Sequence, residues 1–365
     1  MPADRARLTV DLDALAANHA LLRRMAGGAE VAPVVKADGY GLGSGPVARR
    51  LWADGAKSFF VARVEEGEAL RAQLGPGRDA RILVFDGCPA GAAQRLVQAG
   101  LVPVLNSPAQ VEAFAAFVRP RGGAPCALHI DTGMHRLGLT PEELEALASA
   151  TDRMAGLKVD LLISHLACAD QEEARMNAQQ AGRFKAARAL MPDVPASLAN
   201  TAGVFLGAAF HLDMVRPGVG LYGGGPFGAP HPKLEPVATL EAPILQVRAV
   251  AEGETVGYGA AFTAGRACRI AIVAAGYADG VLRSSAGQGR AWLAGGYRKI
   301  LGRVSMDLMA IDVTGCEDAR PGTLVELLGA NVRLDEAAAA AGTVSYEVLT
   351  RLGHRAERVY VGERN

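Results

Sequence analysis

Residues 127–164 read ALHIDTGMHRLGLTPEELEALASATDRMAGLKVDLLIS, and they contain one complete strand–helix–strand pattern. The runs at 127–131 and 160–164 are short and mostly apolar, and several runs of this kind in the chain are continuous rather than alternating, as expected of parallel strands buried on both faces. Between them, Thr140 precedes Pro141 and two acids, which is the order of an N-cap, a first helical position and the positive end of a helix dipole. The stretch therefore predicts one β–α–β unit of a parallel sheet.

The same strand–helix pattern repeats through the first 230 residues, where each short apolar run is followed by a segment with helical spacing. Residues 108–119, for example, place Val111, Phe114 and Val118 on one helix face. Eight such runs over this length predict an α/β fold of the (β/α)8 TIM barrel type. The expected strands are residues 33–37, 58–62, 82–85, 101–105, 127–131, 160–164, 196–200 and 213–216.

The pattern changes near residues 232–236, and glycine turns then join β-type runs. These runs are residues 244–250, 270–275, 300–304, 310–313 and 324–328, and the alanine-rich segment 335–341 predicts a short surface helix. We therefore expect a barrel over 1–235 followed by a mainly β C-terminal domain over 236–365. The first few residues are placed with the barrel but could pack with the C-terminal domain.

The composition restricts the kind of partner. The chain has 365 residues, and its 38 basic side chains balance 38 acidic ones. Nucleic acids and anionic membranes normally bind a basic surface, so neither is expected as a partner. No apolar run suggests a secretory signal or a membrane span, and the scattered cysteines form no CxxC pair that would suggest a disulfide framework or a zinc site. We expect a reduced cytoplasmic protein without a metal, with His19, His135, His211 and His231 at the surface or in loops.

Polar residues follow the expected barrel strands, at the end where active sites of such barrels lie. They are Lys36, Arg136 after Asp131, His165, Asn200 with Thr201, and Arg216 with Gly218. Lys36 follows two valines, and a desolvated ammonium loses its proton readily, which suits Schiff-base chemistry with a carbonyl. The plainer interpretation is a ring of ordinary loop residues, with Lys36 extending its amine to solvent.

Eight short motifs, in their order and spacing, resemble those of the alanine racemases, pyridoxal-phosphate enzymes of the barrel type. The resemblance covers nearly the whole chain. The motifs are VKADGYG at 35–41, HIDTGMHRLG at 129–138, SHLACAD at 164–170, SLANTAG at 197–203, VRPGVGLYG at 215–223, VGYG at 256–259, GYADG at 276–280 and GRVSMD at 302–307.

The resemblance implies interconversion of L-alanine and D-alanine by two bases, to supply D-alanine for peptidoglycan or to catabolise it. Lys36 would hold pyridoxal 5'-phosphate covalently and act on one face of Cα, while Tyr258 from a partner subunit would act on the other. An amine and a phenol both have intrinsic pKa values near 10, so both need lowering to serve as bases. A homodimer with composite active sites follows.

The resemblance also implies roles for further residues. Arg216 would face the pyridine nitrogen and disfavour its protonation, which limits side reactions, and His165 would hydrogen-bond and orient Arg216. The other implied cofactor-binding residues are Tyr40, Asn200, Thr201, Gly218, Val219 and His354. Arg136, Met306 and Asp307 would contact the substrate, and Tyr277, Arg303 and Asp170 would line an access corridor.

Two positions depart from the family pattern. His129 stands where well-known members carry a carbamylated lysine, so another group, such as His129 itself, must orient Arg136. Residues 346–356 lack the tyrosine that many relatives place near the phosphate, and His354 is its expected replacement. Both changes bear on cofactor affinity, rate and substrate breadth more than on the type of reaction.

Four other functions are compatible with parts of this pattern. A serine or broad-specificity racemase shares the same motifs, whereas decarboxylases of basic amino acids have longer chains and different second-domain motifs. A non-catalytic pyridoxal-phosphate-binding barrel usually lacks a second domain. A metal-dependent barrel hydrolase would need clustered His and Asp ligands, and the His-x-His pair typical of one such class is missing.

Overall fold

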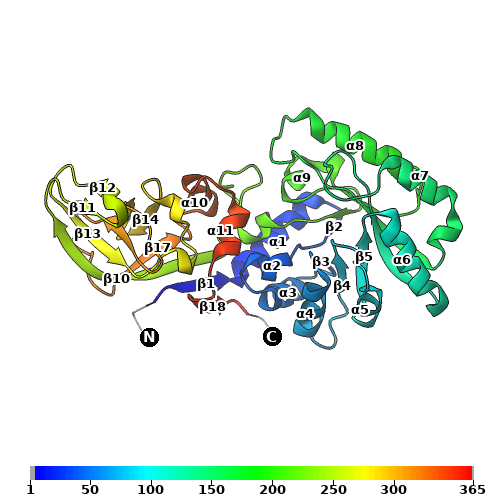
Figure 1. Ribbon diagram of the computed structural model, residues 1–365, viewed down its shortest axis with the longest axis horizontal. Coiled ribbons are helices and arrows are strands. Elements are labelled where there is room, and N and C mark those ends of the chain that lie inside the picture. Colours follow the sequence, from blue (N-terminus) through cyan, green and yellow to red (C-terminus); the bar gives the residue numbers. More distant parts are fainter. Residues whose placement is uncertain (1–4, 364–365) are drawn as a thin grey trace. The chain divides into compact units, whose positions relative to one another are not determined.

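The computed structural model describes residues 5–363 and divides into two compact units (Figure 1). The barrel unit comprises His19–Gly39 and Gly43–Leu221. The β unit comprises the chain up to Asn18, Tyr40–Leu42 and the chain from Tyr222 onward. The expected boundary between residues 235 and 236 stays a prediction. Within residues 5–363, no helix is both long and apolar enough to cross a membrane.

The barrel unit is a ring of parallel strands, which confirms the predicted fold class. The strand order is β2-β9-β8-β7-β6-β5-β4-β3, and a parallel bridge between Val34 and Phe60 brings the ends of this order together. The strands are β2 (Glu30–Val31), β3 (Ser58–Val61), β4 (Arg81–Val84), β5 (Leu101–Leu105), β6 (Ala124–His129), β7 (Leu157–Ile163), β8 (Ala196–Ser197) and β9 (Met214–Val215). Because they are parallel, their carboxyl ends meet at one mouth.

Apart from the left-handed turn labelled α2, helices follow these strands and lie outside them (Figure 1). Helix α6 buries the face predicted from its spacing, and Thr140 caps α7 by accepting a hydrogen bond from the Glu143 N–H. The helices are α1 (Leu12–Ala26), α2 (Lys36–Tyr40), α3 (Ser44–Ala53), α4 (Val64–Leu74), α5 (Ala93–Gln98), α6 (Pro108–Val118), α7 (Pro141–Ser149), α8 (Arg175–Arg188) and α9 (Thr201–Phe205).

The first expected strand, at 33–37, differs from the structure. The regular strand is Glu30–Val31, and only Val34 of the predicted run forms a bridge. From Ala37 onward the backbone is left-handed, with φ values of 52° at Ala37 and 54° at Asp38. The apolar run therefore indicated burial correctly, but the chain leaves the sheet before Lys36.

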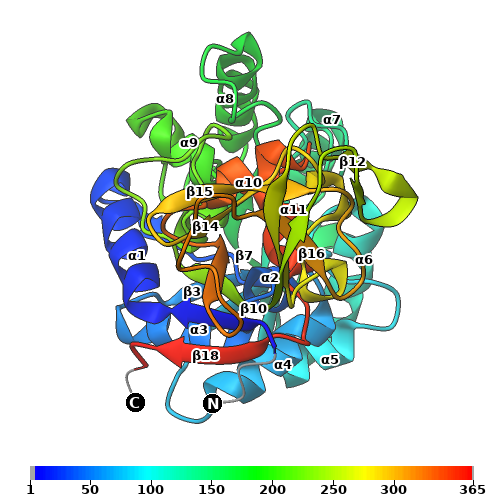
Figure 2. The ribbon, with the colours of Figure 1, turned by 90° about the vertical axis from the view of Figure 1, so that its left-hand side faces the viewer.

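The β unit contains an eight-stranded sheet in the order β13-β16-β15-β14-β17-β10-β1-β18. Strand β1 (Arg7–Asp11) lies between β10 (Ala238–Val250), to which it is antiparallel, and β18 (Glu357–Val361), to which it is parallel. Figure 2 shows β1 in blue beside β18 in red. The other strands are β11 (Thr255–Val256), β12 (Phe262–Thr263), β13 (Cys268–Val273), β14 (Arg290–Leu293), β15 (Gly296–Leu301), β16 (Met309–Asp312) and β17 (Leu324–Leu328).

Two short helices complete the β unit, namely α10 (Leu334–Ala340) and α11 (Ser345–Arg351). The alanine-rich helix forms as expected, but its first residues are not at the surface. Asp335 is buried, and its carboxylate accepts hydrogen bonds from the Gly225 N–H at 2.9 Å and the Ser345 hydroxyl at 2.6 Å. This carboxylate fixes the start of α10, which explains why the segment is anchored rather than solvated.

The expectation that four histidines lie at the surface or in loops is wrong for one of them and incomplete for another. His19 is buried on α1, where burial lowers the pKa of its imidazole to about 4. His211 lies in a loop but is also buried, with Nε2 2.9 Å from the Val204 carbonyl oxygen. The five cysteines, all within the described residues, are free thiols.

Candidate active site

Lys36 stands at the point where the chain leaves the barrel sheet. The four residues that follow it all have positive φ, up to 63° at Gly39. Residues with a Cβ are disfavoured in this conformation, so contacts must hold the turn. The Ala37 N–H donates to Glu66 Oε1 at 2.9 Å, and Asp38 Oδ1 accepts from the Ser44 N–H at 2.8 Å. The turn thereby holds the backbone of Lys36 in a defined direction.

The surroundings of Lys36 favour its neutral amine. Burial lowers the pKa of the Lys36 ammonium, and the positive charge of Arg136 lowers it further against the smaller opposing effect of Glu66. Its Nζ lies 5.7 Å from the centre of the Phe85 ring. A partly buried amine with a lowered pKa is the kind of nucleophile that reacts with carbonyl groups.

Arg216 is a buried cation whose hydrogen-bond partners are neutral. Its Nη1 donates to Ser197 Oγ and its Nη2 to the Ser164 carbonyl, each at 2.5 Å. Burial lowers the pKa of its guanidinium to about 9. The expected hydrogen bond to His165 is absent from the described residues, which corrects the prediction. Ser197 takes that place because the pairing of β8 with β9 sets Ser197 opposite Met214, two residues before Arg216.

Two neutral histidines lie close to this cation. The pKa of His165 is well below its ordinary value because of burial, with Arg216 and Arg136 adding to the effect. Burial, Arg216 and Arg136 also lower the pKa of His129, to about 4. The Gln180 amide supports this region, because it donates to the His165 carbonyl at 2.9 Å.

The tautomer of His129 follows from its neighbour Asn106. The Asn106 amide nitrogen donates to the carbonyls of Phe85 and Val104, each at 2.8 Å. Its oxygen must then accept from His129 Nδ1, which lies 2.7 Å away. The Nε2 of a neutral His129 is therefore left as an acceptor. Such an acceptor suits the expectation that His129 orients Arg136, which stays a prediction.

The segments after β8 and β9 meet at Thr201. Its Oγ1 accepts hydrogen bonds from the N–H groups of Gly218 at 3.0 Å and Gly220 at 3.2 Å. A Cβ at Gly220 would lie 2.7 Å from Thr201 Cγ2, so this close approach requires glycine. The Asn200 side chain caps α9 by accepting a hydrogen bond from the Gly203 N–H. The N–H groups that precede Gly203 have no intrahelical acceptor, because they belong to the first turn of the helix. The first N–H groups of α9 and the N–H of Val219 are therefore candidate backbone donors to a ligand.

The remaining barrel residues of the predicted site are exposed. Arg136 and Asp170 both have accessible side chains. The turn that carries Arg136 is shaped by Asp131, whose Oδ1 accepts from the N–H groups of Gly133, Met134 and His135. Arg136 is therefore held by its backbone while its guanidinium remains available. Within residues 5–363, no group of three or more His, Cys, Asp or Glu side chains is arranged to hold a metal ion.

Tyr258 projects from the β unit, and its residue is 71% exposed. It begins a short 3-10 helix, Tyr258–Ala260, after Gly257, whose φ is 79°. The Arg303 guanidinium approaches the adjacent Gly259, where a Cβ would lie 2.9 Å from Nη1. A hollow of about 340 Å³ beside Tyr258 is lined by Arg303 and mostly apolar residues, including Leu308. The predicted Tyr258 and Arg303 thus lie together on this unit.

Tyr277, Met306 and Asp307 occupy two loops of the β unit that are joined through their backbones. The Tyr277 N–H donates to the Ser305 carbonyl at 3.0 Å. A Cβ at Gly276 would lie 2.3 Å from the Met306 carbonyl oxygen, so glycine is required for this approach. Met306 and Tyr277 are 53% and 44% exposed. The structure therefore brings the predicted corridor and substrate residues of this unit together.

Tyr40 is buried in the β unit. Its ring stacks on Tyr222, with centroids 4.6 Å apart, and leans against Tyr346 at 5.9 Å. Burial raises the pKa of the Tyr40 phenol. His354 is exposed, and the predicted cofactor contacts of Tyr40 and His354 stay predictions. The sequence reading did not single out Tyr346, although its tyrosine ring is the one beside Tyr40.

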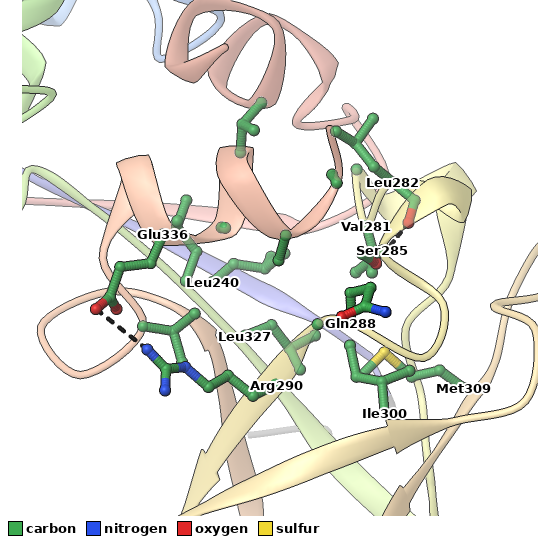
Figure 3. A pocket seen from close by; sticks show the side chains of 18 of the residues that line it. Leu240, Val281, Leu282, Ser285, Gln288, Arg290, Ile300, Met309, Leu327 and Glu336 are labelled. Carbon is green, nitrogen blue, oxygen red and sulfur yellow. Dashed lines mark hydrogen bonds and ion pairs between the residues drawn. The ribbon is translucent and has the colours of Figure 1, made fainter. Parts of the chain in front are cut away.

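A cavity of about 280 Å³ lies between α10 and the sheet of the β unit (Figure 3). Its wall is mostly apolar, with the ion pair of Arg290 and Glu336 at one side and the Gln288 side chain among the lining groups. Gly280, Met309 and Leu352 also line it. These three residues adjoin or closely follow the loops that carry Tyr277, Met306 and His354.

Four further residues that support the predicted site were missed by sequence reasoning. Asn106, Ser164 and Ser197 act through the hydrogen bonds described above, and Arg355 through ion pairs with Asp279 and Asp307. Ser164 and Ser197 lie inside quoted motifs, so their position beside site residues was the available signal. Arg355 directly follows His354 in the segment 346–356, so it carried the same signal, whereas Asn106 carried none because its partner His129 is distant in sequence.

Family models match almost the whole chain. Residues 10–226 match the alanine racemase N-terminal domain and residues 237–360 match its C-terminal domain. The chain belongs to the alanine racemase family. The family's two domains correspond to the two parts of the motif series, with the change between residues 226 and 237.

Individual relatives agree with this assignment. An alanine racemase of Rhodospirillum rubrum is 47% identical over 98% of this chain and 96% of its own length. A catabolic alanine racemase of Mesorhizobium japonicum is 45% identical over 97% of this chain and 93% of its own. The crystal structure of alanine racemase from Bartonella henselae with covalently bound pyridoxal phosphate has a TM-score of 0.92 at 34% identity, covering 98% of this chain and 99% of that one.

Proposed function

We propose that this protein interconverts L-alanine and D-alanine with pyridoxal 5'-phosphate as cofactor. The observation that carries the proposal is that two unusual groups occur together in the barrel unit. One is the Lys36 amine, whose pKa is lowered, and the other is the buried Arg216, whose hydrogen-bond partners are neutral. The relatives described above are alanine racemases, and they support this activity rather than serine racemisation, decarboxylation, simple cofactor binding or metal-dependent hydrolysis.

The barrel residues fit the cofactor by the chemistry of their donors. Lys36 supplies the amine, and the N–H groups at the start of α9 and at Val219 supply donors for a phosphate. Gly220 leaves the space beside Thr201 that a Cβ would fill. When bound, pyridoxal phosphate withdraws electrons from the substrate Cα, which makes the Cα proton removable.

Arg216 would hold the pyridine nitrogen of the cofactor. Its hydrogen bonds go to a hydroxyl and carbonyls, and no carboxylate of the described residues is among its partners. A guanidinium keeps its own protons, so it donates to the ring nitrogen instead of protonating it. An unprotonated ring nitrogen would limit how strongly the bound cofactor withdraws electrons from Cα. Return of a proton to Cα would then be favoured over other reactions.

Two proton carriers are needed on opposite faces of Cα. Lys36 provides a partly buried amine that can hold or release a proton. Tyr258 provides the second group, and its exposure suits a residue that enters the barrel of a second subunit. Arg136 would bind the substrate carboxylate, with Met306 and Asp307 beside it.

We infer that the active form is a homodimer with composite sites. Tyr258, Tyr277, Met306 and Leu308 are large apolar or aromatic residues that are exposed on the β unit. Exposed groups of this kind mark surfaces that a partner covers. The catabolic or biosynthetic role and the cytoplasmic location stay predictions.

Subunit mixing tests the composite site. Lys36→Ala and Tyr258→Phe homodimers should each be almost inactive, because each site lacks one proton carrier. Exchange of their subunits gives heterodimers with one intact site, so mixing should restore about a quarter of the wild-type activity. No recovery after demonstrated subunit exchange would contradict the composite site.

Proton exchange in deuterated water tests the reaction. The cofactor-loaded protein is incubated with L-alanine, with L-serine in parallel, and optical rotation and Cα deuterium are followed. Loss of rotation with deuterium in both enantiomers is expected for alanine. Deuterium in L-alanine without loss of rotation would show one working base, and an unchanged solution would reject racemisation.

A further inference from the structure

Three loops of the β unit meet around one arginine, Arg355. The first contains Tyr277 and Asp279, and the second contains Met306 and Asp307. Their backbones are joined by hydrogen bonds from the N–H groups of Tyr277 and Ala278 to the carbonyls of Ser305 and Met306, at 3.0 and 3.1 Å. The third loop, which carries Arg355, approaches through the Gly353 N–H and the Asp279 carbonyl at 3.4 Å.

The guanidinium of Arg355 binds the side chains of both other loops. Its Nε and Nη2 donate to the two carboxylate oxygens of Asp279 at 2.7 and 2.5 Å. Its Nη1 donates to Asp307 Oδ1 at 2.5 Å, and Nη2 lies 3.5 Å from the Met306 carbonyl oxygen. One planar side chain therefore connects Asp279 with the segment that carries Met306 and Asp307.

Asp279 is the fixed end of this arrangement. Its side chain is 5% exposed, whereas that of Asp307 is 59% exposed. The same carboxylate also accepts from the Gly276 N–H at 2.9 Å, which ties it to its own loop. A buried, fully bonded carboxylate aims the guanidinium, and the guanidinium then sets the exposed Asp307.

A cavity adjoins these loops. The cavity of about 280 Å³ is lined by Gly280, Met309 and Leu352, which follow or precede the three loops in the chain (Figure 3). An empty volume forfeits the contacts that a filled core would supply. The ionic connection therefore adds a side-chain restraint to the backbone hydrogen bonds that hold the loops of Tyr277 and Met306 together.

We propose that Arg355 is a positioning residue that holds the Met306–Asp307 edge and the Tyr277 loop in the arrangement the substrate requires. In this proposal the Asp307 carboxylate binds Arg355 rather than the substrate, and Asp307 affects the reaction by fixing the position of its loop. This inference rests on the proposed function, in which these loops border the substrate. The side chain of Arg355 needs no contact with substrate to act in this way.

Steady-state kinetics of Arg355→Lys provide the first test. Lysine keeps the charge but lacks the planar fork that binds Asp279 and Asp307 together. We expect KM for L-alanine and D-alanine to rise about tenfold, with a smaller fall in kcat and unchanged absorbance of the Lys36-bound cofactor. Arg351→Lys is the matched control, because Arg351 is exposed and its guanidinium pairs with the nearby Glu347 at 3.5 Å, away from Asp279 and Asp307. Its KM should not change.

A double-mutant cycle separates positioning from direct substrate contact. If Asp307 acts through Arg355, Asp307→Asn raises KM in the wild-type protein and has little further effect in Arg355→Lys. If the effects multiply, Asp307 contacts substrate independently and the proposal is overturned. An Arg355→Lys protein that melts at a lower temperature with unchanged KM would also overturn it, since Arg355 would then only stabilise the fold.

Asp307→Asn keeps an oxygen for Nη1 and leaves Asp279 intact, so it remains informative if Arg355→Lys does not fold. In that case an unchanged KM in Asp307→Asn rejects the proposal, and a raised KM with unchanged absorbance of the Lys36-bound cofactor supports it. Wild-type protein without racemase activity would reject the proposed function instead. The two failures are therefore distinguishable.

Discussion

His129 should make the barrel unit less stable in mild acid, and the effect can be worked from its surroundings. Burial, with help from Arg216 and Arg136, lowers the pKa of His129 to about 4 from 6.5. The unfolded chain therefore binds a proton more readily than the folded one. Stability from this residue is complete above pH 6.5 and is lost as the pH falls from 6.5 to 4.

The expected loss is about 3 kcal/mol, because each pKa unit between the folded and unfolded values corresponds to about 1.4 kcal/mol. His129→Asn removes the titrating ring and keeps an amide N–H that can donate to Asn106 Oδ1. The variant is offset from the wild type at every pH by its lost contacts. Between pH 7 and pH 4, however, it should lose about 3 kcal/mol less than the wild type does.

Urea unfolding followed by tryptophan fluorescence measures this difference. The chain has two tryptophans, Trp52 on α3 of the barrel unit and Trp292 on β14 of the β unit. In a Trp292→Phe background, the signal of Trp52 reports the barrel unit alone. Equal losses in the two proteins between pH 7 and pH 4 would refute the conclusion that the fold holds His129 neutral.

Three substitutions test the packing around the site. Gly220→Ala places a Cβ 2.7 Å from Thr201 Cγ2, so thermal melting should show that the free energy of unfolding falls by about 1–3 kcal/mol. Thr201→Ser in the same chain removes Cγ2 and should largely restore the stability. No restoration would place the strain elsewhere. Ser197→Ala removes the hydroxyl that accepts from Arg216 and should cost about 1.5–3 kcal/mol in urea unfolding, whereas a neutral effect would mean that water replaces the hydroxyl. Gly276→Ala would force the Met306 carbonyl to move, so racemisation should fall about tenfold or more with cofactor content unchanged, and full activity would contradict the predicted role of this loop.

The barrel strands were predictable because burial leaves short, mostly apolar runs in their sequences. Strand β5 is buried at every position, as its run at 101–105 indicates. Strand β14 escaped detection because arginine and tryptophan interrupt its four residues, and β18 because its side chains are only half-buried. Burial on both faces is visible in a sequence, whereas pairing of half-exposed strands depends on distant neighbours.

The candidate site shows the same division between local and distant causes. Lys36 was predictable because a charge beside two valines is costly unless it has a purpose. The partner of Arg216 was not predictable, because the register of β8 against β9 selects Ser197. Nor was the partner of Arg355, because Asp279 lies 76 positions earlier in the chain. Motifs identify the reacting groups, and the fold selects what holds them.

The position of β1 between β10 and β18 has a consequence for biosynthesis. Strand β1 ends at Asp11, whereas its parallel neighbour begins at Glu357 and is therefore synthesised much later. At about 5–20 residues per second, roughly 20–70 s pass before that neighbour is made. During this time the strand is unpaired and could pair with other nascent chains. Its alternation of apolar and polar residues, with Leu8 and Val10 buried in the finished fold and the charged Arg7 and Asp11 at its ends, disfavours such pairing. Translation speed over the barrel segment is therefore a variable to which the yield of folded protein should respond.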